Sequence, residues 1–150
     1  MCIRDSPKTP PPVTIAQKGY QFKVGLVVIP LNTTVFFPNQ DPDYHNVYSL
    51  SRPKRFDIGR YKKDDSPVPS ILFDKEGYIR INCEIHEHMQ AHVIVVDSPL
   101  FTISDAAGSF VLKGIPPGNY TLHGQSDSKN KWKTPITITA GKETQVSLDK

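Results

Sequence analysis

A short stretch near the middle of the chain carries side chains that bind metals. A thiol, an imidazole and a thioether follow one another there at Cys83, His86 and Met89, and His45 supplies a second imidazole upstream. Two His, one Cys and a weakly bound axial Met form the ligand set of a blue-copper site, in which soft sulfur favours Cu(I) and imidazole suits both oxidation states. These residue types predict a centre that binds one copper ion and exchanges one electron.

The segments on either side of this stretch have the pattern of β-strands. Tyr78 to Asn82 alternates and leads into Cys83, and His92 to Val96 leads away from the loop. Such a short loop can wrap three ligands round one face of a metal. His45 must then come from a neighbouring strand. Asn46, directly after it, is placed to hydrogen-bond across to the Cys83 loop and to orient the metal ligands.

The same loop offers an alternative ligand, His88, which would compete with Met89. Simple surface exposure also explains His88 and His92, since the loop provides no rigid geometry for a fifth ligand. Taken singly, a Cys or a Met in a β protein is usually a buried apolar residue. The ordered set of ligands is much harder to obtain by chance, so we favour the metal site.

The composition indicates a small all-β protein. The chain has 150 residues with 9 Gly and 14 Pro, and its turns recur too often for long helices. The net charge of +3 comes without interleaved stacking aromatics, so nucleic-acid binding is not expected. No apolar run approaches the length of a membrane span. Only Cys2 and Cys83 are present, which argues against a disulfide framework.

Turn signals divide the chain into a leader at residues 1–12, a copper domain at 13–97 and a second module at 98–150. Strands are expected at 13–17, 22–30, 33–37, 56–58, 70–73, 78–82 and 92–96, then at 100–104, 109–112, 120–125, 134–139 and 144–148. Trp132 falls in a loop of this scheme. Residues 1–6 look like translated adaptor sequence, so we expect that a secretion signal has been lost.

Charged residues outside the loop have two interpretations. The basic stretch Arg52 to Lys63 either docks an acidic redox partner by electrostatic steering or is a solvated loop with offsetting aspartates. A docking surface near His86 is the other candidate for the partner. The acidic residues Asp41 and Asp43 fit ordinary turn chemistry better than a calcium site or an acid–base pair. No nucleophile triad, phosphate loop or dinucleotide fingerprint is present, so an enzyme is not expected.

The metal-binding motifs also carry a family resemblance. They are His45-Asn46-Val47 and Cys83-Glu84-Ile85-His86-Glu87-His88-Met89. The first half of the chain, at about 13–97, resembles the cupredoxins, most nearly the plastocyanin- and amicyanin-like group. The resemblance implies a Greek-key sandwich with copper at one end and one-electron transfer between redox partners. Glu87 replaces a Pro found in many relatives, and the loop is more polar than the apolar patch through which cupredoxins usually exchange electrons.

The second half resembles the carboxypeptidase regulatory-like module, which is a small transthyretin-like β-sandwich and is not catalytic. Residues 103–110 and 114–122 carry this resemblance. The order of the two modules is similar to that of secreted bacterial proteins of the methylamine-utilisation type, which implies a periplasmic or secreted location. If residues 1–6 are an artefact, the second module is incomplete and has an exposed sheet edge.

Three functions follow from these observations. The first is a type 1 copper protein that carries electrons, with His45, Cys83 and His86 as strong ligands and Met89 as the weak one. The second is a copper-binding protein for storage or delivery. The third is a metal-free binding module of two sandwiches, in which the ligand set is a coincidence.

Overall fold

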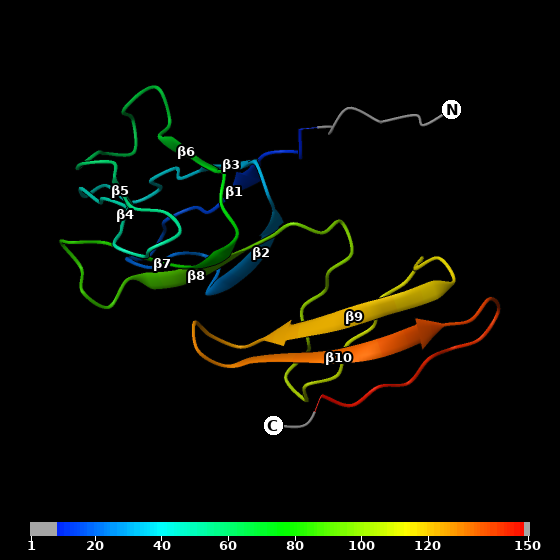
Figure 1. The fold of residues 1–150 in the computed structure, drawn as a ribbon. Coiled ribbons are helices and arrows are strands. Elements are labelled where there is room, and N and C mark those ends of the chain that lie inside the picture. Colours follow the sequence, from blue (N-terminus) through cyan, green and yellow to red (C-terminus); the bar gives the residue numbers. More distant parts are fainter. Residues whose placement is uncertain (1–8, 149–150) are drawn as a thin grey trace. The chain divides into compact units, whose positions relative to one another are not determined.

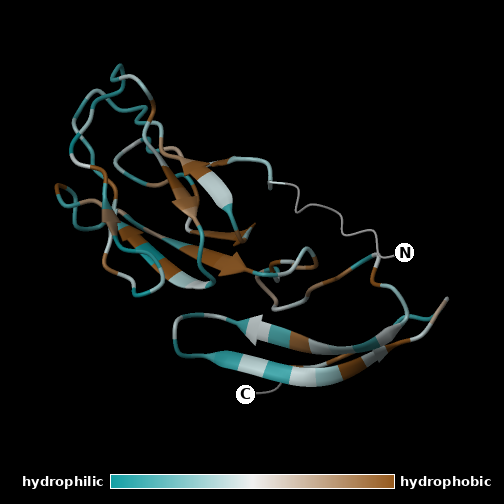
Figure 2. Cartoon of the chain, turned by 45° about the horizontal axis from the view of Figure 1, so that its top comes forward, coloured by the Kyte–Doolittle hydropathy of each residue, from teal (hydrophilic) through white to brown (hydrophobic). Residues whose placement is uncertain are grey.

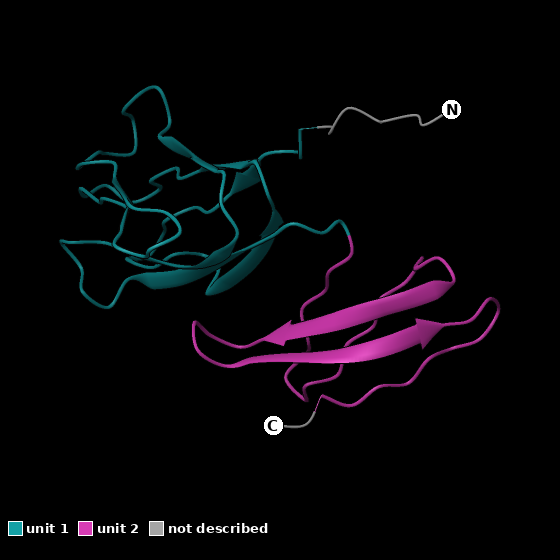
Figure 3. Ribbon diagram, in the orientation of Figure 1, with its two compact units in different colours: residues 1–99 teal, residues 100–150 magenta. Residues whose placement is uncertain are grey.

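A computed structural model describes residues 9–148. The chain divides into two compact units between residues 99 and 100 (Figure 3). The described residues form β-strands and no helix, which confirms the predicted all-β class. Among them, no helix is long and apolar enough to cross a membrane. Most of the predicted leader, 1–12, lies outside the described residues, and the domain assignment 13–97 and 98–150 stays a prediction.

In its described part, the first unit has eight strands in two sheets (Figure 1). The larger sheet has the order β2-β8-β7-β4-β5, with β2 Leu26–Pro30, β4 Tyr48–Ser49, β5 Phe56–Asp57, β7 Gly77–Asn82 and β8 Gln90–Val96. The smaller sheet has the order β1-β3-β6, with β1 Val13–Thr14, β3 Thr33–Phe36 and β6 Ser70–Phe73. The pairs β1–β3 and β2–β8 are parallel, and the other pairs are antiparallel.

The core of the first unit lies between these sheets. In β7, Ile79 and Ile81 are buried while Arg80 between them is exposed, as the period-2 alternation of a strand requires. The smaller sheet contributes buried Val35 and Phe73 to the same apolar cluster. The two sheets therefore form a sandwich, and Figure 2 shows hydrophobic residues along its strands.

The structure corrects several predicted strands of the first unit. The strand expected at 22–30 begins only at Leu26, and the one expected at 13–17 ends at Thr14. The end of the first expected strand and the start of the second, at Gln17 and Phe22, instead pair in an isolated bridge across the turn between them. Strand β4 was not predicted, because two residues are too few for a periodic signal.

The second unit differs more from the prediction. Its described residues, 100–148, form one antiparallel hairpin, β9 Gly118–Gln125 with β10 Lys131–Ile138, in place of five strands. Trp132 lies within β10 and not in a loop. The described residues of 100–104, 109–112 and 144–148 form no strand. Ile103 and Val111 in the first two segments are 50% and 67% exposed, because they have no paired strand to pack on. The transthyretin-like module therefore stays a prediction.

Candidate metal centre

The loop with the predicted ligands connects two paired strands. β7 ends at Asn82, which pairs with Gln90 at the start of β8. Inside this pair, the Cys83 N–H donates to the Met89 carbonyl at 3.2 Å, and the Met89 N–H donates to the His86 carbonyl at 2.9 Å. These backbone hydrogen bonds therefore join Cys83 and Met89 at the base of the loop, and His86 lies in the turn between them.

His45 reaches the same place from a different part of the chain. It forms an isolated bridge with Tyr61, in which each residue donates its N–H to the carbonyl of the other at 3.1 and 2.9 Å. The side chain of His45 is fully buried, and Cys83 is 2% exposed, whereas His86 is half-buried. The two bridging hydrogen bonds fix the His45 backbone before any metal binds.

Three donor atoms converge at this point. The Nδ1 atoms of His45 and His86 are 3.1 Å apart, and the Cys83 Sγ lies 4.0 Å from the first and 3.7 Å from the second. A point equidistant from three atoms at these separations is about 2 Å from each, which matches metal–imidazole bonds and is slightly short for a metal–thiolate bond. Within residues 9–148, His45, Cys83 and His86 form a group whose donor atoms lie close enough together to hold a metal ion.

The other predicted ligands differ in position. Met89 is 1% exposed and tied to the loop through its backbone, as a weak ligand from inside the protein requires. His88 is exposed and lies outside the donor group. Its Nε2 contacts the Tyr20 carbonyl at 2.8 Å, so this nitrogen is already engaged. The geometry therefore favours Met89 over His88 beside the three donors.

Asn46 makes the hydrogen bond expected of it. Its buried side-chain oxygen accepts the N–H of Glu84, the residue after Cys83, at 2.8 Å. Its amide nitrogen donates to Asp57 Oδ1 at 2.8 Å. One side chain thus ties the ligand loop to β5. This orients the Cys83 backbone, which is how an outer contact fixes a metal ligand.

Asp41 is part of the site, although its sequence context indicated only a turn. Its Oδ2 lies 2.8 Å from His45 Nε2, and its carboxylate accepts the N–H groups of Gly19 and Tyr20 at 2.7 and 3.0 Å. Burial by itself raises the pKa of the Asp41 carboxyl. The hydrogen bonds from the Tyr20 amide and from His45 outweigh burial and hold this pKa below its ordinary value.

An ionised carboxylate only accepts hydrogen bonds, so the proton of a neutral His45 ring sits on Nε2. Its Nδ1 then presents a lone pair to the site, as a metal ligand must. Burial, followed by the nearby His45, lowers the pKa of His86. A neutral imidazole is the form that binds metal, so the lowered pKa of His86 favours its metal-binding form.

Tyr20 was also missed by sequence reasoning. Its ring lies edge-on to both imidazoles, with centroids 5.9 Å from His45 and 5.1 Å from His86. Its hydroxyl donates to Asp43. No periodicity or motif marks Asp41 or Tyr20. The only available signal was that Asp41 lies four residues before His45, a spacing with many uses in turns.

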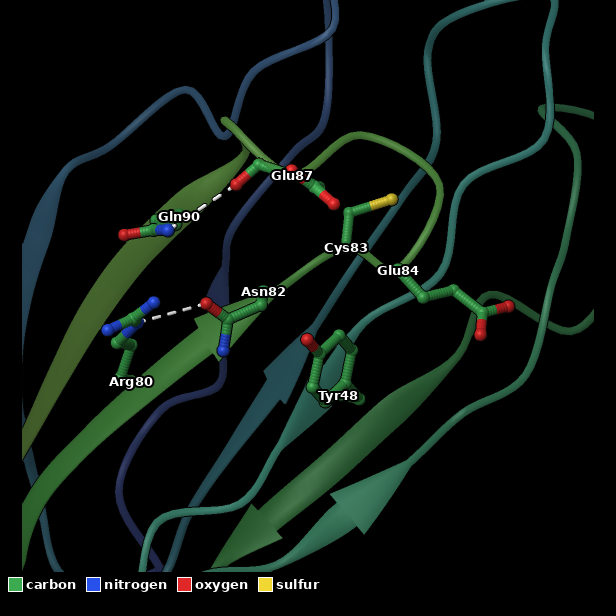
Figure 4. A pocket seen from close by; sticks show the side chains of 7 residues that line it. All are labelled: Tyr48, Arg80, Asn82, Cys83, Glu84, Glu87 and Gln90. Atoms are coloured by element: carbon green, nitrogen blue, oxygen red, sulfur yellow. Dashed lines mark hydrogen bonds between the residues drawn. The ribbon is translucent and has the colours of Figure 1, made fainter.

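An open depression of about 430 Å³ flanks the Cys83 backbone (Figure 4). Its lining is mostly polar and comprises Tyr48, Arg80, Asn82, Cys83, Glu84, Glu87 and Gln90. Neither His45 nor His86 lines it. Of the three donor residues, only Cys83 borders the depression, and His86 is the one that is half-exposed to solvent.

Comparison with known proteins places the fold. No protein-family model matches the chain, and neither does a curated protein. Among solved structures, amicyanin from Paracoccus versutus is similar at 24% identity and a TM-score of 0.51, over 56% of this chain and 80% of that one. A reduced Cu(I) form of an amicyanin mutant is similar at 18% identity and a TM-score of 0.51, over 56% and 81%.

A copper-containing nitrite reductase from Thermus scotoductus matches at 24% identity and a TM-score of 0.54. The match covers 65% of this chain but only 25% of the reductase chain. At these identities the likeness concerns the fold alone. The chain therefore has an all-β fold similar to that of the cupredoxins.

Proposed function

We propose that this chain is a type 1 copper protein that carries one electron at a time between redox partners. His45, Cys83 and His86 bind the copper ion, and Met89 is its weak axial ligand. The observation that carries the proposal is the convergence of two imidazole Nδ1 atoms and one thiol sulfur, 3.1 to 4.0 Å apart, from two separate loops. Sulfur and imidazole donors in this ratio suit a copper ion that changes oxidation state.

The surroundings of the donors support electron transfer. Asn46 holds the Cys83 loop, and Asp41 holds the His45 ring, so the donors stay in place when the copper charge changes. One such site stores one electron, which suits a carrier more than an enzyme that must deliver several.

We place the redox partner on the face where His86 is half-exposed, with the basic stretch Arg52 to Lys63 beside it. Arg60 of this stretch contacts Glu84 at 2.7 Å, which links the stretch to the ligand loop. Because a copper–thiolate centre works best outside the reducing cytosol, we infer a periplasmic or secreted location.

The test is titration of the metal-free chain with Cu(II). We expect one equivalent to bind and to produce the intense visible band of thiolate-to-copper charge transfer. Cys83→Ser should abolish this band, while Cys2→Ser, which removes the other thiol of the chain, should leave it unchanged. A colourless complex, or a band that survives Cys83→Ser, would sink the proposal.

The rates of electron self-exchange and of copper release distinguish an electron carrier from a copper storage or delivery protein. Fast electron self-exchange and slow copper release to a chelator support electron transport. Slow self-exchange with rapid release would instead assign the site to copper storage or delivery. A chain that takes up no stoichiometric copper would be a metal-free binding module.

A further inference from the structure

We propose that Tyr20 is a positioning residue of the metal centre, whose ring holds the half-exposed His86 imidazole against the buried His45 imidazole before copper binds. The proposal rests on the proposed function, because it concerns the geometry of the copper ligands. Tyr20 belongs to a hairpin that supplies none of the proposed copper ligands.

The backbone of Tyr20 is unusual. Its φ of 58° lies in the left-handed region, which side-chain-bearing residues rarely adopt. Tyr20 follows Gly19, with φ 66°, in a two-residue turn closed by the Lys18 N–H donating to the Gln21 carbonyl at 3.0 Å. Two positive φ values are what a tight hairpin turn requires, and Asn and Gly meet that requirement with least strain. The turn therefore does not explain why a Tyr stands here.

Four contacts hold Tyr20 in this conformation, and all of them lead to the metal site. Its N–H donates to the Asp41 carboxylate, which also binds His45 Nε2. Its carbonyl contacts Nε2 of His88, two residues after His86. Its hydroxyl donates to Asp43, two residues before His45. The same few residues thus fix both the strained turn and the ligand loops, as expected where strain has a functional use.

The fourth contact is made by the ring, which meets both imidazoles at angles of 78° and 68°. These near-perpendicular arrangements are favourable for aromatic pairs. The two imidazoles are themselves 4.9 Å apart between centroids. His45 is held by Asp41 and Tyr61, whereas within residues 9–148 the hydrogen-bonding contacts of the His86 ring go only to the other two donors, His45 and Cys83. Outside the donor set, the Tyr20 ring at 5.1 Å is the nearer of two aromatic neighbours of His86, and the exposed His88 ring follows at 6.2 Å. The Tyr20 ring is therefore the neighbour best placed to restrict His86.

The decisive variant is Tyr20→Gly, because Gly accepts a positive φ and removes only the ring and its contacts. We expect copper release to a chelator to become roughly tenfold faster, the lower end of the effect of losing an outer contact. The reduction potential should fall, since water reaching the imidazoles stabilises the more highly charged Cu(II). Tyr20→Phe, which keeps the ring, should stay within about twofold of the wild-type release rate.

Tyr44→Ala is the matched control. Tyr44 is 48% exposed, and Lys62 Nζ lies 4.6 Å from its ring centroid, so its loss should leave release and potential unchanged. Thermal melting of the copper-free variants checks that they fold. If Tyr20→Gly does not fold, Tyr20→Asn takes its place, because Asn also tolerates positive φ.

A second measurement needs no copper. NMR relaxation of the His86 ring in the metal-free protein should show added mobility in Tyr20→Gly and none in Tyr20→Phe. Release rates within twofold of wild type, together with an unchanged His86 ring, would overturn the proposal. If the wild-type chain binds no copper, the proposed function fails, whereas the ring measurement still decides the role of Tyr20.

Discussion

At the scale of single residues, the site depends on a carboxylate that does not contact the metal position. Asp41 binds the Nε2 side of His45 and, through two backbone N–H groups, the turn that carries Tyr20. It therefore fixes the tautomer of one ligand and the position of the ring that packs on both.

Replacing Asp41 by Asn should weaken copper binding by roughly 10- to 100-fold, because the amide is a weaker acceptor and an amide flip can turn a donor toward His45. Competition with a chelator of known affinity measures this loss. Asp64→Asn, at an exposed position directly after the basic stretch, is the control. An unchanged affinity in Asp41→Asn would show that the tautomer is set by other contacts.

At the scale of elements, the strand leading into the ligand loop begins at a glycine that the packing requires. Gly77 has φ 140°, and a Cβ built on it would lie 2.6 Å from Cγ of Pro53. A proline ring cannot move aside as a long flexible side chain can. Strand β7 therefore approaches the 51–54 turn more closely than any larger residue permits.

Gly77→Ala should lower the free energy of unfolding by about 1–3 kcal/mol, the usual cost of overpacking. Chemical denaturation of the metal-free chain measures it. Gly25→Ala is the matched control, because nothing lies within 4 Å of its added Cβ and its φ is not positive. Equal stability of the two variants would contradict the close approach.

The β9–β10 hairpin contains a titratable turn. The Asp127 carboxylate accepts the backbone N–H groups of Asn130 and Lys129 and the Asn130 side-chain amide, and these bonds lower its pKa to about 2. A lowered folded-state pKa means that the stabilisation is complete above the unfolded value of 3.8 and is lost as the pH falls through about 2.

NMR titration of the Asp127 carboxyl carbon should give a midpoint near 2, with the amides of Lys129 and Asn130 shifting together with it. In Asp127→Asn, these two amides should lose that pH dependence. A midpoint at the ordinary value for Asp would show that the turn bonds do not form in solution.

At the scale of the whole molecule, the two units differ in how they are stabilised. The buried core and all proposed ligands lie in the first unit. In the second unit, no described residue is buried, and an isolated two-stranded hairpin is only marginally stable in water.

A chain cut after residue 99 should therefore still fold and bind one equivalent of copper with its visible band, whereas residues 100–150 alone should lack cooperative unfolding. Circular dichroism during heating and copper titration of each fragment are the measurements. Loss of copper binding by residues 1–99 would mean that the second unit contributes to the site.

The sequence by itself determined the all-β class, most of the strands of the first unit and the four candidate ligands. It could do so because strand periodicity and the Cys83–Met89 spacing are local properties. Asn46 was also accessible, since it follows a ligand directly. The sequence predicted too many strands in the second unit. Apolar alternation at 100–104 and 109–112 leads to a strand only if a partner strand is present to pair with it.

The tertiary structure alone decided the rest. It brought Asp41 to the far nitrogen of His45 and Tyr20 against two imidazoles, and it turned His88 toward the Tyr20 carbonyl. These contacts join the hairpin near residue 20, the loop before β4 and the Cys83 loop. No short-range pattern records them, because each depends on where a turn directs a side chain after the two sheets have packed.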